Sequence, residues 1–158
     1  MEEKRKILTL CMVQQGSKVL LGFKKRGFGQ GKWIGFGGKV EAGETIEQAA
    51  IRELQEESGL FGRDADQVAV LEFRFEFKPS EVLEVHLFRV TEFEGELQES
   101  DEMKPEWFNQ DSMPFDQMWG DDRYWFDLFL AGKKFKGNFL FDNSEKIKKH
   151  QITEVEGF

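Results

Sequence analysis

Apolar and polar residues alternate along several stretches of the chain, and this period of two predicts a protein rich in β-strands. Between Val68 and Phe77, phenylalanines occupy every second position from residue 73 onward and charged residues stand between them, which indicates a strand with one face in water. The Gln-Gly-Ser and Pro-Ser sequences at 15–17 and 79–80 are typical of turns. Further strands are predicted at residues 7–14, 18–24, 82–93, 106–108, 135–141 and 151–155, with an extended piece at 33–36.

Two segments have helical character instead. Residues 44–58 contain no proline or glycine and consist largely of good helix formers, so we expect a helix that ends at Gly59. Residues 121–130 are predicted to form a second helix, with the side chain of Asp121 or Asp122 as its N-terminal cap. Strands flanking two helices indicate an α+β fold. No internal repeat or linker is visible, which favours a single domain over residues 1–158.

Carboxylates fall on the inward face of the first predicted helix. At roughly 100° per residue, Ile46 and Ala50 define the apolar face, Glu53 and Glu57 project onto it, and Glu56 lies at its border. Clustered carboxylates repel one another, and anions near a helix C-terminus oppose the helix dipole. We therefore expect a bound cation here, and oxygen ligands suit Mg²⁺ or Mn²⁺.

Two other charged residues are expected to support this helix. Arg52 and Glu56 are spaced i,i+4, so Arg52 can pair with Glu56 and orient it. Glu44 points away from the acidic face, and we interpret it as a structural residue near the helix start. The alternative, an ordinary solvated acidic helix, is disfavoured because the carboxylates share the inward face.

Composition and charge limit the classes of partner. The 158 residues include 17 Phe and 4 Trp, so aromatic packing should dominate the core, and the lone Cys11 is predicted to be buried in it. A net charge of -8 disfavours a nucleic-acid polymer, whereas a metal and local lysines still allow a small anionic substrate. The N-terminal residues form no apolar signal region and no run reaches membrane-spanning length, so we expect no membrane contact and a cytoplasmic protein, with a nuclear or mitochondrial pool left open for a eukaryotic cell.

Residues 38–60 follow the pattern G-x5-E-x7-R-E-L-x-E-E-x-G-L. This pattern matches the Nudix box at every fixed position, and the chain resembles the Nudix hydrolases. Segments 20–29, 35–40, 99–103 and 118–126 are similar to the animal MutT homologues within that family, and the likeness runs from about Lys6 to the C-terminus. The resemblance implies the Nudix fold, an α/β/α sandwich around a mixed sheet, and a monomer.

The resemblance also implies an activity. The expected reaction is Mg²⁺-dependent hydrolysis of oxidised or otherwise modified purine nucleoside triphosphates to monophosphate and pyrophosphate, which sanitises the nucleotide pool. Expected substrates are 8-oxo-dGTP, 2-oxo-dATP and N6-methyl-dATP, and Mn²⁺ is a substitute metal. Other Nudix substrates (dinucleoside polyphosphates, ADP-ribose, RNA caps) stay open as an alternative. A non-catalytic nucleotide-binding module is disfavoured because every box carboxylate is present.

By the same resemblance, residues of the box take roles at a metal site. Glu53 and Glu56 hold metal, and Glu57 binds metal or activates water. The Gly38 carbonyl is an additional ligand. Glu102, in Ser-Asp-Glu-Met, approaches from a loop as a ligand or general base. The alternative role for Glu102 is that of an ordinary loop acid. Lys24 is expected near the substrate phosphates, and the alternative is an ordinary surface lysine.

The family likeness further implies a base pocket. Trp119 and Phe28 are expected to sandwich a flat purine. Asp121 and Asp122 cannot both ionise easily in a dry pocket, so one protonated carboxyl should donate a hydrogen bond while the other accepts. A helix cap is the competing role for one of these acids. The other expected lining residues are Thr9, Phe73 or Phe75, Met103 and Trp125.

One position departs from the family pattern. The animal MutT homologues carry Asn in the Gly-x-Trp-Asn-Gly-Phe-Gly-Gly segment, whereas this chain has Ile34. An Asn can hydrogen-bond the O6/N7 side of a purine and Ile34 cannot. We therefore expect weaker use of 8-oxo-dGTP, or a shift toward adenine-type or alkylated purines.

Overall fold

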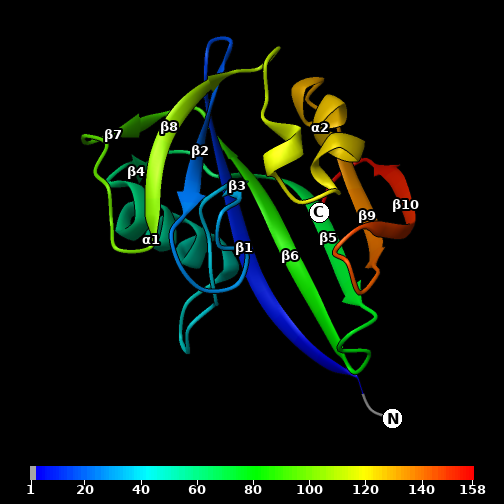
Figure 1. Cartoon of the computed structure of the whole chain (residues 1–158). Helices are drawn as coiled ribbons and strands as arrows, with labels where there is room; N and C mark the ends of the chain where they lie inside the picture. Colours follow the sequence, from blue (N-terminus) through cyan, green and yellow to red (C-terminus); the bar gives the residue numbers. More distant parts are fainter. Residues whose placement is uncertain (1–2) are drawn as a thin grey trace.

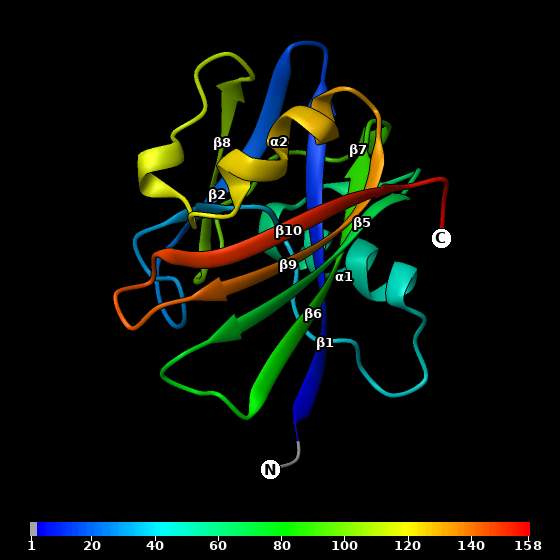
Figure 2. The same ribbon diagram turned by 90° about the vertical axis from the view of Figure 1, so that its right-hand side faces the viewer.

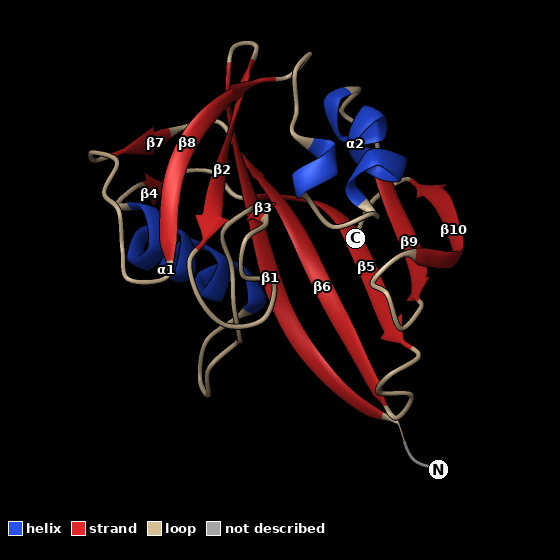
Figure 3. Ribbon diagram, viewed as in Figure 1, coloured by secondary structure: helices blue, strands red, loops and turns tan. Residues whose placement is uncertain are grey.

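The computed structural model describes residues 3–158, so the first two residues of the charged N-terminal segment lie outside it. Most of the secondary structure consists of strands, and the helices lie outside the sheet that they form (Figure 3). The strands are β1 (Lys4–Gln15), β2 (Lys18–Lys24), β3 (Trp33–Ile34), β4 (Phe61–Gly62), β5 (Asp66–Phe75), β6 (Glu81–Val90), β7 (Phe93–Glu94), β8 (Met103–Asn109), β9 (Lys134–Phe141) and β10 (Ile147–Val155). The helices are α1 (Ile46–Ser58), the 3₁₀ turn η1 (Phe115–Gln117) and α2 (Asp122–Leu130).

The main sheet is mixed. Its strand order is β10-β9-β5-β6-β1-β2-β3, and β8 also pairs with β2 (Figure 1). The pairs β1–β6 and β5–β9 are parallel, and the other pairs in this sheet are antiparallel. Strands β4 and β7 form a separate two-stranded sheet.

Successive residues of the central strands point to opposite faces of the sheet, and each face has its own core. On β1, Cys11 belongs to the core under α1, where its Sγ donates to the Ala50 carbonyl at 3.5 Å, whereas Met12 belongs to the core under α2. The two helices lie on opposite sides of the sheet (Figure 2). The expected α+β fold with helices on both faces of a mixed sheet is therefore confirmed, as is the burial of Cys11.

Helix α1 begins two residues later than predicted. Thr45 is its N-cap: the Thr45 hydroxyl accepts from the Gln48 N–H at 3.1 Å, and the Gln48 side chain accepts from the Thr45 N–H at 2.8 Å. Such a capping box satisfies two backbone donors, which fixes the start of the helix. The helix ends as predicted at Gly59, whose φ of 83° is left-handed.

The prediction that an aspartate side chain caps α2 is wrong. Asp121 occupies the N-cap position, but it has helical backbone angles and its side chain makes no capping hydrogen bond. The Asp121 carboxylate instead accepts a hydrogen bond from the Trp125 indole.

Several strand boundaries also differ from prediction. Strand β5 ends at Phe75, before the turn that contains Pro79, and β6 stops at Val90 with β7 as a separate strand. Strands β8 and β10 are longer than expected because they extend along β2 and β9 over their whole length. Within residues 3–158, no helix has the length and apolar character needed to cross a membrane.

Candidate active site

Two hollows with shared lining residues form the candidate site. One is a largely apolar cavity of about 370 Å³, and the other is a carboxylate-lined hollow of about 540 Å³. They share the residues Lys24, Gly37, Gly38, Lys39 and Glu57. A ligand with a flat apolar part and an anionic tail can therefore occupy both hollows at once.

The carboxylate hollow gathers the acidic residues expected at the metal site. Glu53, Glu56 and Glu57 of α1 line it together with Gly38, and Glu102 lines it from the loop before β8. In the described part of the chain, no three acidic, histidine or cysteine side chains are already drawn together as a ligand cluster. Arg52 bridges two of these carboxylates, since its Nη1 donates to Glu53 at 2.9 Å and to Glu56 at 3.3 Å.

Glu57 is the most deeply placed of these acids. It is only 6% exposed, and its carboxylate accepts a hydrogen bond from the Gly37 N–H at 2.8 Å. Burial raises the pKa of Glu57 to about 8; the Gly37 hydrogen bond opposes this shift, and the Glu53 charge adds to it. A cation in the hollow would favour the ionised form of this carboxyl.

Glu53 lies directly against the backbone of Gly38. A Cβ at position 38 would stand 2.7 Å from the Glu53 carboxylate, so only glycine leaves room for this approach. Burial raises the pKa of Glu53, although the hydrogen bond from Arg52 opposes the shift. The Gly38 carbonyl accepts from the Thr9 N–H at 2.9 Å and, over a longer distance of 3.4 Å, from the Thr9 hydroxyl.

Arg52 contacts its predicted partner Glu56 and, more closely, two further acids. Its strongest partner is Glu44, which accepts from Nη2 at 2.7 Å and from Nε at 3.0 Å, and Glu53 accepts from Nη1 at 2.9 Å. The predicted partner Glu56 is farther away, at 3.3 and 3.4 Å. The Arg52 hydrogen bonds lower the pKa of Glu44 to about 2. The structural role expected for Glu44 fits this geometry, because Glu44 fixes the guanidinium that faces Glu53.

Glu102 is half exposed and lies within reach of two cations. Its carboxylate is 3.8 Å from Lys24 Nζ and 3.9 Å from Arg26 Nη2. The Lys25 N–H donates to the Glu102 carbonyl at 2.8 Å, which ties the loop after β2 to this segment. Lys24 lines both the acidic hollow and the apolar cavity.

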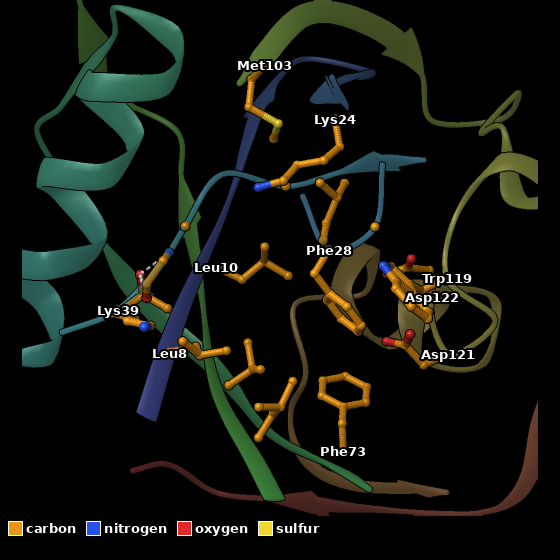
Figure 4. A pocket seen from close by; sticks show the side chains of 18 of the residues that line it. Leu8, Leu10, Lys24, Phe28, Lys39, Phe73, Met103, Trp119, Asp121 and Asp122 are labelled. Atoms are coloured by element: carbon orange, nitrogen blue, oxygen red, sulfur yellow. Dashed lines mark hydrogen bonds between the residues drawn. The ribbon is translucent and has the colours of Figure 1, made fainter. Parts of the chain in front are cut away.

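Asp121 and Asp122 supply the acidic end of the apolar cavity (Figure 4). Each is 4% exposed. The Trp125 Nε1–H donates to Asp121 Oδ2 at 2.8 Å. Burial raises the pKa of Asp121 to about 6, against the effect of the Trp125 hydrogen bond. Burial, and then the neighbouring Asp121 charge, raise the pKa of Asp122 well above its ordinary range.

Most of the other expected pocket residues line the apolar cavity: Thr9, Phe28, Ile34, Phe73, Met103 and Trp119. Phe75 lines it as well, so the choice between Phe73 and Phe75 resolves to both. The expectation for Trp125 is wrong: it is fully buried outside the lining, beneath Asp121. It therefore orients an acid of the pocket rather than contacting what the pocket holds.

The expected sandwich geometry is also absent. Phe28 and Trp119 stack directly on each other, with ring centroids 5.1 Å apart and 25° between their planes. Two stacking contacts of about 3.5 Å each would separate the rings by roughly 7 Å. No purine fits between the two rings in this arrangement.

Lys39 is the main site residue that the sequence analysis did not single out. It lines both hollows and lies on the opposite side of the cavity from the aspartates (Figure 4). Its position directly after Gly38 was the available signal. Leu8, Leu10 and Phe141 also line the cavity, and their alternation along β1 and β9 could have indicated this face.

The fold and the glycine-flanked acidic helix define a class of protein. The chain belongs to the Nudix family: the family model described as the NUDIX domain matches residues 4–129. It is 54% identical over 151 residues to the oxidized purine nucleoside triphosphate hydrolase of Danio rerio, covering 96% of each chain. It is 48% identical to the protein of the same name from Mus musculus, covering 97% of each. The crystal structure of a MutT protein from Bacillus halodurans superposes with a TM-score of 0.83 at 28% identity, covering 93% of this chain and 97% of that one.

Proposed function

We propose that this protein hydrolyses oxidised or otherwise modified purine nucleoside triphosphates to the monophosphate and pyrophosphate, with Mg²⁺ as the metal. The observation that carries the proposal is the joining of an apolar cavity that ends in two buried aspartates to a hollow lined by box carboxylates. The names of the fish and mouse relatives support this substrate class. Removal of such nucleotides would sanitise the nucleotide pool.

The residues of the acidic hollow fit a divalent cation. The acidic side chains offer only hard oxygen donors, as Mg²⁺ prefers, and the absence of a Cβ at position 38 lets the Glu53 carboxylate approach the backbone there. Glu53, Glu56, Glu57 and the Gly38 carbonyl would hold the metal, with Glu102 as a further ligand from its loop. The metal would neutralise charge on the triphosphate and acidify water for attack.

The surrounding residues complete the site. Arg52 hydrogen-bonds Glu53 and, over a longer distance, Glu56, and this pairing keeps both carboxylates in the wall of the hollow. Lys24 and Lys39 line the passage between the hollows and offset phosphate charge there. Glu57 or Glu102 would take the proton from the attacking water.

At the other end, the two aspartates read the base. A protonated carboxyl donates to a ring nitrogen or carbonyl, and its ionised neighbour accepts from an N–H. The apolar walls remove the base from water, which favours a flat aromatic ring over a free sugar phosphate.

Replacement of Glu56 by Gln tests the metal assignment. Glu56→Gln should lower kcat about a hundredfold or more while the unfolding temperature stays near that of the wild type, because the side chain is largely exposed. Glu47→Gln, on the first turn of the same helix and away from the hollow, is the matched control. Full turnover by Glu56→Gln with Mg²⁺ would remove this assignment.

A further inference from the structure

The loop between β2 and β3 covers one side of the apolar cavity. Its tip residue Phe28 stacks on Trp119, yet the Phe28 side chain is 59% exposed. Trp119, by contrast, is only 8% exposed. A purine that stacks on this face of Trp119 must therefore displace Phe28.

A second contact holds the same loop. Lys32 Nζ lies 4.9 Å from the centre of the Trp119 ring and 3.6 Å from Glu145 Oε1. Glu145 belongs to the turn between β9 and β10, so the ion pair joins the pocket loop to a hairpin at the far end of the strand order. Lys32 thus fastens the C-terminal side of the loop across Trp119.

The loop is firmly fixed at its base and hinged at its tip. Lys24 N–H donates to the Lys32 carbonyl, and Gly31 N–H donates to the Lys24 carbonyl, both at 2.9 Å. Between these contacts, Gly27 and Gly29 have φ values of 81° and 84°, and Gly31 follows with 87°. This left-handed region favours glycine, whose backbone rotates with little steric cost. Gln30 N–H donates to the Gly27 carbonyl and Lys32 N–H to the Gly29 carbonyl, both at 3.1 Å. Rotation at the glycines that swings Phe28 exchanges these two turn hydrogen bonds with water but leaves the strand pairing intact.

We propose that residues 26–30 form a lid over the base cavity, held shut by the Phe28–Trp119 stack and braced at its C-terminal end by the Lys32–Glu145 ion pair, and that an entering base displaces Phe28 from Trp119. A single ring contact and a partly exposed ion pair are weak, so the closed lid is favoured by no more than about tenfold to a hundredfold. The nature of the entering base rests on the proposed function. The closed state itself does not, because it exists in the protein alone.

Fluorine NMR of protein labelled with 5-fluorotryptophan measures the lid without any nucleotide. Replacement of Trp119 by Phe assigns its resonance among the four tryptophans, and Phe28→Ala supplies the open reference. Glu145→Gln should move the Trp119 resonance from the wild-type position toward that reference, and about 0.5 M salt should do the same in the wild type. Glu76→Gln is the matched control, because it removes the ion pair between Glu76, which follows β5, and Lys148 on β10 of the same hairpin. This change should leave the Trp119 resonance unchanged.

Nucleotide entry is measured by stopped-flow fluorescence without metal. Glu145→Gln should raise the association rate of a modified purine triphosphate by about threefold to tenfold, and lower KM, with kcat unchanged. The proposal would be overturned if the chemical shift of Trp119 changed neither in Glu145→Gln nor with added salt. An association rate for the nucleotide that is unchanged in Glu145→Gln would also overturn it. Failure of the proposed function alone would give a different result. The Trp119 resonance would still shift in Glu145→Gln, but the protein would hydrolyse no purine triphosphate.

Discussion

The Gly37 N–H donates a 2.8 Å hydrogen bond to the Glu57 carboxylate, and this contact joins the two halves of the site. Glu57 lies in the last turn of α1, among the box carboxylates, Gly37 belongs to the loop before that helix, and both residues line both hollows. The position of the acidic helix is therefore set by the same backbone segment that forms the wall of the base cavity. Such a link fixes the distance between the proposed metal site and the apolar cavity proposed to hold the base.

The buried position of Glu57 predicts proton-linked metal binding. Its pKa of about 8 in the metal-free protein means that it is mostly protonated at pH 7, and a cation binds the ionised form. Mg²⁺ binding at pH 7 should release close to one proton, and Mg²⁺ affinity should increase from pH 6 to about pH 8. Calorimetry in buffers of different ionisation enthalpy measures this proton release. Release that persists in Glu57→Gln would assign it to another group.

The aspartate pair predicts that stability falls as pH rises. Both folded pKa values lie above the unfolded value of about 3.9, so the native state holds protons that the unfolded state has released. The free energy of unfolding should therefore decrease from about pH 4 upward, through about pH 6 for Asp121 and further for Asp122. Thermal melts of metal-free protein should show a Tm that drops by several degrees between pH 5 and pH 8.

Asp122→Asn should flatten this slope and raise the stability at pH 8 by about 1–3 kcal/mol, because it removes a buried charge. Asp116→Asn is the control, since Asp116 precedes the pair in the same segment and its side chain is 99% exposed. An unaltered slope in Asp122→Asn would contradict the assignment of the pH dependence to this pair.

Ile34 predicts which modified base is preferred. It lines the cavity with no hydrogen-bonding group, so a polar base edge that faces it stays unpaired at a cost of about 1–3 kcal/mol. Ile34→Asn should raise kcat/KM for 8-oxo-dGTP about tenfold relative to 2-oxo-dATP and N6-methyl-dATP. Ile34→Leu keeps an apolar side chain of the same size and should retain the wild-type ratios. Equal ratios in all three proteins would mean that position 34 does not contact the distinguishing edge.

We expect Arg52 to position the Glu53 carboxylate in a way that a lysine cannot. Its guanidinium contacts Glu44 through two nitrogens and Glu53 through a third, a geometry that needs the planar fork of arginine. Arg52→Lys should lower kcat about tenfold to a hundredfold, with a smaller change in KM for the nucleotide and a higher Mg²⁺ requirement. Arg63→Lys, which pairs with Glu94 at an exposed site, should leave kcat unchanged. Wild-type kcat in Arg52→Lys would contradict this role.

The sequence predicted best what depends on local periodicity. The bounds of β2 agree with prediction, and the helical period correctly brought Glu53 and Glu57 to the buried face of α1. The family pattern added the arrangement of the sheet between its two helices. The strand bounds and the helix face follow from spacing along the chain, whereas the arrangement of the sheet rests on the resemblance to the family.

The errors arose where tertiary contacts decide. Trp125 and Asp121 are four residues apart on or beside α2, and their hydrogen bond turned the expected pocket tryptophan into a buried support. The direct stacking of Phe28 on Trp119 joins residues far apart in the chain, and nothing in either local sequence predicts it. Arg52 pairs with Glu56 as predicted, but it binds Glu44, outside the helix, more closely because the loop before α1 folds back toward it.

Product identification with a nucleotide panel tests the central claim most directly. The protein is incubated with Mg²⁺ and 8-oxo-dGTP, 2-oxo-dATP, N6-methyl-dATP, dGTP, dATP, a dinucleoside polyphosphate, ADP-ribose and capped RNA, and products are separated by chromatography with and without added pyrophosphatase. We predict monophosphate and pyrophosphate from at least one modified purine triphosphate, with kcat/KM about tenfold or more above that of dGTP and dATP. A diphosphate and free phosphate as products, or turnover confined to the dinucleotide, ADP-ribose or capped RNA, would contradict the proposed function.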